Sequence, residues 1–179
     1  SIPVFAGVET PLSGRKVWST GSEGKAFSNL NQYALEDRRA VEFLVEAVNQ
    51  NPGEIEVIAI GPLSNIATAI MQAPNFAKNV KHLWIMGGDF TKEKIEHNFK
   101  CDVDAAKIVL ESEISITILD LPSSQKTIIK KDEIEQIRSS GRLGPILHTE
   151  ILNWIHPRHQ DWTTPHDPIA VLAMLEPEF

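Results

Sequence analysis

The stretch that decides the fold is Ile55–Ile60, with the sequence IEVIAI, followed directly by GPLSN at residues 61–65. β-branched residues dominate this short apolar run, which is typical of a strand buried on both faces of a sheet. The Gly-Pro pair ends the strand. Ser64 or Asn65 can cap a following helix, because either side chain can accept a hydrogen bond from a free N–H of the first turn. The stretch therefore predicts a strand, a tight turn and a helix.

The same alternation continues along the chain. Val80–Met86 (VKHLWIM) ends at two glycines, and Ile114–Leu119 (ISITIL) is a third predicted strand. Helical spacing of apolar residues predicts helices at Leu35–Asn49, Asp102–Glu111, Lys131–Ser139, Leu143–Ile155 and from about Pro168, with a polar loop over residues 89–101. Strands that alternate with helices imply βαβ units. We expect an α/β fold with an open, mostly parallel sheet flanked by helices, whose ligands bind at the carboxyl ends of the strands.

Composition excludes several classes of partner. The formal net charge is -7 and the chain has no basic run, which disfavours nucleic acid and anionic membrane surfaces as partners. No apolar stretch is long enough to span a bilayer. Cys101 is the one cysteine, so no disulfide can form within the chain, which favours a reducing, cytoplasmic location.

Two strand-end segments carry polar groups that suit a ligand. The Gly61–Asn65 turn can be a plain strand-to-helix connection, or it can offer a backbone carbonyl oxygen to a hard cation. Glu96 and Asn98 lie two residues apart, so in an extended segment their side chains point the same way. A carboxylate beside an amide suits the hydroxyls of a sugar, although a solvated polar loop is the alternative. His97 would then point away and be structural or exposed.

The segment Thr164–Pro168 (TPHDP) opens the last predicted helix. Asp167 can cap that helix with Pro168 at its first position, or it can bind a metal ion. His166 is a plausible general acid, because histidine titrates near neutral pH.

Other acidic and histidine residues favour structural roles. Asp102 and Asp104 flank the start of a predicted helix and suit capping and the helix dipole. A zinc site built from histidines is disfavoured, because a proline separates two of them and no HExxH pattern is present. The histidines considered are His148, His156, His159 and His166.

Taken together, these segments resemble the inosine–uridine-preferring nucleoside hydrolase family. The matching stretches are IPVFAGVETPL, EVIAIGPLSNIATAI, LWIMGGDF, EHNFKCDVDAAKIVLES and HDPIAV. Their order and spacing fit from end to end. The resemblance implies a nucleoside hydrolase fold, with residues 1–179 as the central part of a single domain.

The resemblance also implies an activity and a site. Members hydrolyse the N-glycosidic bond of ribonucleosides to ribose and free base, in purine and pyrimidine salvage, and hold one Ca²⁺ ion. By position, Asp167 resembles a calcium-binding aspartate, and Ile60 resembles the residue whose backbone carbonyl binds the ion. Glu96 and Asn98 resemble ribose ligands, Met86 a residue lining the pocket near the sugar, and His166 the histidine that protonates the leaving base. Members are usually homodimers or homotetramers, and a histidine before the aspartate resembles those with broad or pyrimidine-leaning use.

The chain departs from the family pattern. The family's DxDxGxDD motif, which supplies most calcium carboxylates and the general base, lies before the IPVFAG segment and is absent from these 179 residues. The segment after the last helix is absent as well, and the 89–95 loop is shorter than in many relatives and lacks their ribose-binding asparagine. We therefore expect an incomplete domain that is inactive alone.

Two other readings follow from the same residues. A non-catalytic module that binds nucleosides or sugars is the alternative to the hydrolase. A generic nucleotide-binding domain is disfavoured, because no GxGxxG or Walker-type glycine loop follows a strand.

Overall fold

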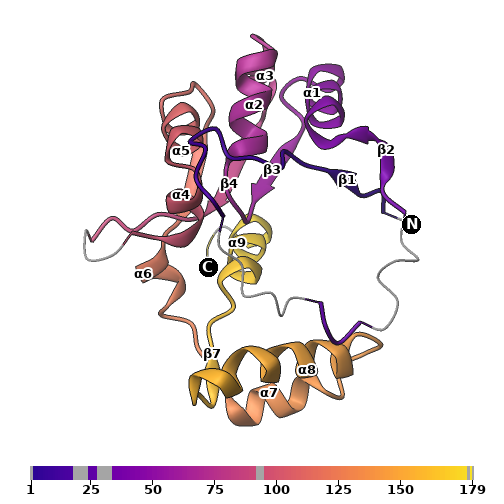
Figure 1. Ribbon diagram of the computed structural model, residues 1–179, viewed down its shortest axis with the longest axis vertical. Helices are drawn as coiled ribbons and strands as arrows, with labels where there is room; N and C mark the ends of the chain where they lie inside the picture. Colours follow the sequence, from indigo (N-terminus) through magenta and orange to yellow (C-terminus); the bar gives the residue numbers. More distant parts are fainter. Residues whose placement is uncertain (1, 18–23, 28–33, 92–94, 177, 179) are drawn as a thin grey trace. The chain divides into compact units, whose positions relative to one another are not determined.

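The computed structural model describes residues 2–17, 24–27, 34–91, 95–176 and 178, which form two compact units (Figure 1). The first unit contains the described residues of 1–18, 35–123 and 166–179. The second contains those of 19–34 and 124–165. Among the helices of the described residues, none is long and apolar enough to cross a membrane.

A parallel sheet of three strands organises the first unit. Strands β3 (Glu56–Ala59), β4 (His82–Met86) and β5 (Ile116–Leu119) lie in that order, with β4 in the centre. Strands β1 (Phe5–Ala6) and β2 (Glu36–Arg39) form a separate parallel pair. The predicted α/β fold with an open, mostly parallel sheet and flanking helices is confirmed, and each of the three predicted strands starts one or two residues later than expected.

Seven helices belong to this part of the described chain or lead out of it. They are α1 (Ala40–Gln50), α2 (Ser64–Gln72), α3 (Phe76–Asn79), α4 (His97–Cys101), α5 (Val103–Leu110), α6 (Leu121–Ser124) and α9 (His166–Leu175). The helix predicted from Leu35 starts only at Ala40, because the residues before it form β2. The polar loop predicted over 89–101 contains α4, while residues 92–94 of that loop lie outside the described residues.

The core of the first unit lies on one face of the sheet, under α1, α2, α3 and α5. Alternate strand residues point into it, and they are Val57, Ala59, Leu83, Ile85, Ile116 and Ile118. Leu83, Ile85 and Phe76 have no exposed surface. Burial of each such side chain contributes about 1.5–3 kcal/mol to stability, so this face holds most of the apolar stabilisation of the sheet.

The opposite face is partly polar, and the prediction that the strand at Ile55–Ile60 is buried on both faces was wrong. All four residues of β3 are only partly buried. Glu56 on this face binds Lys81 Nζ at 2.6 Å and accepts a hydrogen bond from Trp84 Nε1 at 2.8 Å. Helix α9 packs against β4, beside the carboxyl ends of the strands in Figure 1.

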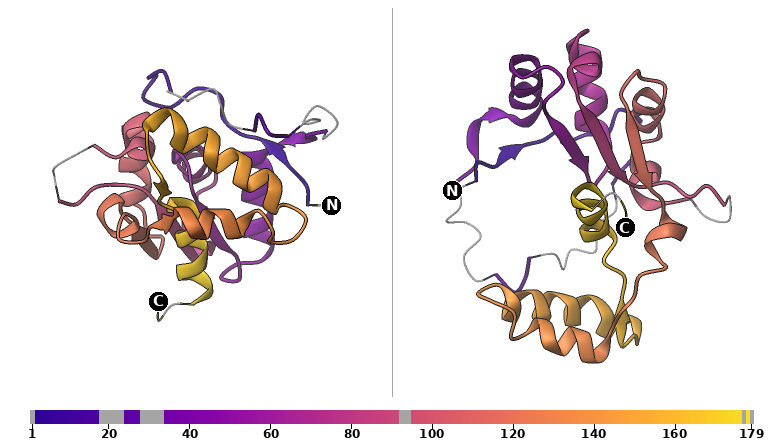
Figure 2. Two further views of the ribbon diagram at one scale, coloured as in Figure 1. Left: turned by 90° about the horizontal axis from the view of Figure 1, so that it is seen from below. Right: turned by 180° about the vertical axis from the view of Figure 1, so that it is seen from behind.

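The second unit is mainly a pair of helices. Helices α7 (Lys131–Ile137) and α8 (Gly144–Ile155) run side by side (Figure 2), followed by a 3₁₀ turn at His156–Arg158. Strands β6 (Ile129–Lys130) and β7 (Trp162–Thr163) form a short antiparallel pair. That the chain is the central part of one domain stays a prediction.

Candidate active site

Glu96 is held in place by three backbone N–H groups. Glu96 is the N-cap of α4, and its backbone is extended, with φ −64° and ψ 149°. Oε1 accepts a hydrogen bond from Asn98 N at 2.7 Å, and Oε2 accepts from Phe99 N at 3.0 Å. Oε2 also accepts from Gly88 N at 2.9 Å, which joins the start of α4 to the end of β4. The carboxylate is thereby fixed at the carboxyl end of the central strand.

Asn98 meets the same strand end by a different route. Its Nδ2 donates to the backbone oxygen of Met86 at 2.9 Å and lies 3.6 Å from the Met86 sulfur. Because a backbone oxygen only accepts, the amide nitrogen must face Met86 and Oδ1 must face away. The predicted site residues Glu96, Asn98 and Met86 are therefore brought together.

The predicted backbone conformation of residues 96–98 was wrong. Asn98 lies in α4, so residues 96–98 are not an extended segment with two parallel side chains. The cap hydrogen bond, rather than strand geometry, links Glu96 to Asn98. The alternative of a solvated loop is also wrong for both residues, because Glu96 is 5% and Asn98 8% exposed. His97, in contrast, is exposed as predicted.

The side-chain oxygens of Glu96 and Asn98 can still accept further hydrogen bonds. A carboxylate offers about four lone-pair positions, and the three N–H groups occupy three of them at Glu96. No donor to Asn98 Oδ1 is present among the described residues. One carboxylate oxygen and one amide oxygen are thus left to accept from a ligand, and hydroxyl groups are suitable donors.

Two glycines make this arrangement possible, a role that sequence reasoning missed. Gly88 has φ +81°, in the left-handed region that disfavours side chains. A Cβ atom on Gly87 would lie 2.7 Å from Cε1 of the Phe99 ring and 3.3 Å from Glu96 Oε2. The glycines therefore let α4 approach the end of β4 closely. The GG pair after LWIM was the available signal, but it indicated only the end of a strand.

Helix α9 brings His166 and Asp167 to the same strand, because α9 packs against β4. The helix begins at His166, so Asp167 lies in the first turn and Pro168 is not the first helical residue, contrary to the capping alternative. An acidic residue in the first turn is also favourable to the helix dipole.

The electrostatics tie these two residues to Glu96. Burial raises the pKa of Asp167, His166 lowers it and the negative charge of Glu96 raises it further, with a net increase. Burial lowers the pKa of His166, and this outweighs the opposing effect of Asp167 and Glu96. Asp167, His166 and Glu96 therefore share one electrostatic environment at the end of β4.

The carboxylate of Asp167 is the kind of oxygen ligand that a hard cation takes. It is partly buried, and burial is the main reason that its pKa is raised, with His166 opposing the effect. A divalent cation beside it would stabilise the charged form. The described residues hold no group of three or more His, Cys, Asp and Glu side chains that could bind a metal. Among the described residues, neutral oxygens such as backbone carbonyls could add to Asp167, and the resemblance assigns the other carboxylates to the DxDxGxDD motif.

Ile60 and the turn after it were predicted as a source of such an oxygen. Ile60 directly follows β3, which is paired with β4 through Ala59 and Ile85, so its carbonyl lies at the correct edge of the sheet. The predicted capping of α2 was wrong. Leu63 is the N-cap and makes no side-chain cap hydrogen bond. Both side chains bind residues distant in the sequence instead. Asn65 Oδ1 accepts from Val8 N at 2.8 Å, and Ser64 Oγ donates to Asp102 Oδ2. The metal role of Ile60 stays a prediction.

Asp102 is the residue whose role sequence reasoning most underestimated. Its predicted cap of α5 is confirmed by a hydrogen bond from Ala105 N at 3.2 Å. The same carboxylate also accepts from Leu12 N, Ser13 N and Ser64 Oγ. Burial alone would raise its pKa, but these hydrogen bonds outweigh burial and lower the pKa. A local sequence motif does not reveal hydrogen bonds to residues this distant in the chain.

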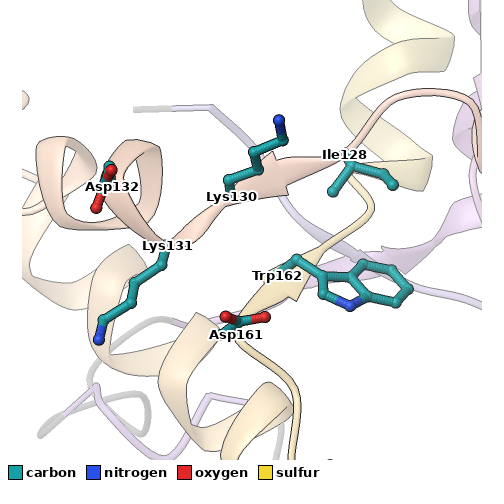
Figure 3. A pocket seen from close by; sticks show the side chains of 6 residues that line it. All are labelled: Ile128, Lys130, Lys131, Asp132, Asp161 and Trp162. Carbon is teal, nitrogen blue, oxygen red and sulfur yellow. The ribbon is translucent and has the colours of Figure 1, made fainter.

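A cavity of about 360 Å³ lies in the second unit and contains no predicted site residue (Figure 3). Two lysines, two aspartates and two apolar side chains line it, and they are Ile128, Lys130, Lys131, Asp132, Asp161 and Trp162. The opposite charges balance, so the lining selects neither an anion nor a cation. The chemistry of the site therefore rests on the end of β4.

Comparison with known proteins identifies the family. The model of the inosine-uridine preferring nucleoside hydrolase family matches residues 1–179, and the chain belongs to that family. A probable uridine nucleosidase 2 of Oryza sativa subsp. japonica is 32% identical over 99% of the chain and 58% of its own length. The pyrimidine-specific ribonucleoside hydrolase RihB of Escherichia coli O1:K1 / APEC is 27% identical over 86% of the chain and 52% of its own length.

Solved structures show the same fold. A plant nucleoside hydrolase, PpNRh1, matches with a TM-score of 0.88 and 26% identity, over 99% of this chain and 61% of that one. A purine-preferring ribonucleoside hydrolase from Gardnerella vaginalis matches with a TM-score of 0.85 and 22% identity, over 99% and 62%. The chain thus spans between one half and two thirds of the length of these relatives.

Proposed function

We propose that the protein is a calcium-dependent ribonucleoside hydrolase that cleaves the N-glycosidic bond to give ribose and free base. The observation that carries the proposal is the grouping at the end of β4. Buried acceptors of Glu96 and Asn98 lie in the same electrostatic environment as Asp167, whose pKa is raised. Membership of the family supports the reaction type.

In this mechanism Glu96 and Asn98 accept hydrogen bonds from ribose hydroxyls. Their positions are set by backbone contacts before the substrate arrives, so little ordering is needed on binding. As the glycosidic bond breaks, positive charge develops on the ribose, and a carboxylate-rich pocket stabilises it. Met86 lines the sugar side of the site.

Asp167 and the carbonyl of Ile60 would hold the calcium ion. When bound, calcium would supply the positive charge that orients the sugar hydroxyls and makes the attacking water more acidic. Asp167 itself is prepared for this role, since a cation removes the unfavourable charge that burial leaves on its carboxylate.

His166 acts on the departing base. The base gains negative charge as it leaves, and protonation by the imidazolium relieves that charge. Because burial lowers the pKa of His166, protonated His166 is a stronger acid than an ordinary histidine but is populated only at lower pH. Uridine is the first substrate to test, because two of the relatives are described as uridine or pyrimidine enzymes.

Calorimetric titration of Ca²⁺ into Asp167→Asn, made in a chain that also carries the family's DxDxGxDD motif, tests the proposal, with ribose release from uridine and inosine measured in parallel. We expect both calcium binding and turnover to be lost, whereas Asp104→Asn, an exposed aspartate on α5, should retain both. Unchanged calcium affinity in Asp167→Asn would refute the ligand assignment. Ribose binding without any turnover, in a chain that carries the DxDxGxDD motif, would favour the non-catalytic sugar-binding module instead.

A further inference from the structure

The carboxylate of Asp102 is a junction of three chain segments. It is fully buried and accepts four hydrogen bonds. Oδ2 accepts from Leu12 N at 2.7 Å and from Ser64 Oγ at 2.6 Å. Oδ1 accepts from Ser13 N at 3.1 Å and from Ala105 N at 3.2 Å. Only the last of these caps a helix, so capping explains one of the four contacts.

Two of the segments joined at Asp102 carry predicted site residues. Asp102 ends α4 as its C-cap, and the same five-residue helix presents Asn98 behind the Glu96 cap. Ser64 begins α2, four residues after Ile60 at the end of β3. Through one carboxylate, the end of α4 is therefore fixed against the turn that follows β3.

The third segment, residues 7–13, is attached at two points. Leu12 N and Ser13 N bind Asp102, and Val8 N binds Asn65 Oδ1 at 2.8 Å. Gly7 approaches Asn65 so closely that a Cβ atom would lie 2.9 Å from Asn65 Nδ2. The segment thus follows the starts of α2 and α5 and is fixed to both.

We propose that Asp102 is a positioning residue for the active site. It acts through α4 and the 60–64 turn, and touches neither sugar nor metal. Loss of its charge frees α4 from the turn, so that Glu96, Asn98 and the Ile60 carbonyl no longer keep their mutual positions. The inference rests on the proposed function, because it assigns the purpose of the junction to that site.

Asp102→Asn tests the inference with almost no change in volume. An amide offers one oxygen and one NH₂ group, so in either orientation the NH₂ group faces at least one backbone N–H that the carboxylate accepted. Residues that orient ligands without touching the metal typically contribute 10- to 100-fold to affinity or activity. In a chain that also carries the DxDxGxDD motif, we expect kcat/KM for uridine and calcium affinity to fall by about 10- to 100-fold, measured well below the melting temperature.

Two further variants make the test specific. Asp104→Asn makes the same chemical change two residues away at an exposed position and should leave both quantities unchanged. Ser64→Ala removes a single side-chain donor to Asp102 and should fold even if Asp102→Asn does not, with a smaller loss in the same direction.

The outcomes separate the inference from the proposed function. A lower melting temperature with unchanged kcat/KM and calcium affinity per folded molecule, in Asp102→Asn or in Ser64→Ala, would overturn the positioning role. If a chain that carries the DxDxGxDD motif and no substitution neither binds calcium nor cleaves nucleosides, the proposed function would be overturned instead.

Discussion

Replacement of Glu96 by Gln should destabilise the protein before any substrate is added. The carboxylate accepts three backbone hydrogen bonds, at 2.7, 2.9 and 3.0 Å. A Gln oxygen in the Oε2 position can keep those from Gly88 N and Phe99 N, but the NH₂ group then faces Asn98 N as a second donor. Leaving one buried donor unsatisfied costs about 1–3 kcal/mol. The opposite orientation of the amide leaves two donors unsatisfied, so this is the lower bound.

Thermal unfolding followed by circular dichroism measures the effect. A free-energy change of 1 kcal/mol shifts Tm by roughly 2–4 °C in proteins of 150–250 residues, so we expect a decrease of about 2–12 °C. Glu113→Gln is the matched control, because Glu113 is exposed, and its free energy of unfolding should change by less than about 0.5 kcal/mol. A Glu96→Gln melting temperature within the error of both wild type and control would refute the reasoning.

Three other substitutions follow from the same structure. In a chain that also carries the DxDxGxDD motif, His166→Ala should slow hydrolysis of uridine more than that of an activated nitrophenyl riboside. Without the substitution, turnover of uridine should decline as pH rises through a His166 pKa below the usual histidine value. Equal slowing of both substrates would contradict the acid role. Gly87→Ala should lower the free energy of unfolding by about 1–3 kcal/mol, because the new Cβ meets the Phe99 ring at 2.7 Å; an unchanged urea midpoint would count against that contact. Leu83→Ala, at a fully buried core position, should cost about 2–5 kcal/mol in the same urea titration.

The sheet could be predicted because its strands carry their own signal. β3, β4 and β5 are short β-branched or aromatic runs closed by glycine or by a polar residue. β2 could not be predicted, since Glu36–Arg39 (EDRR) has no strand character of its own and is extended because it pairs with β1. Tertiary pairing decided its conformation against local propensity.

In the candidate site, too, some features could be predicted from the sequence and others could not. Glu96 and Asn98 could be selected from the sequence, but not their geometry, because the short helix α4 depends on the Glu96 cap and on the two glycines after β4. Ser64 or Asn65 was predicted to cap the helix after β3, yet Leu63 is the N-cap, and the Ser64 hydroxyl donates to the buried Asp102 carboxylate. The hydrogen bonds that join Asp102 to Ser64 and Leu12 span 38 and 90 residues, which no local pattern reveals.

Strand β4 has a consequence for how this protein tolerates insertion and deletion. Leu83 and Ile85 face the core, whereas His82, Trp84 and Met86 face the opposite side, and the backbone oxygen of Met86 holds Asn98. A shift of one residue along the strand exchanges the two faces. A single inserted residue within β4 would therefore place polar and aromatic side chains in the apolar core. It would also move the Met86 backbone oxygen that Asn98 binds, so one insertion would reduce stability and disrupt the site together. Insertions and deletions should therefore be tolerated only in the connections between strands, and the length of β4 should not vary.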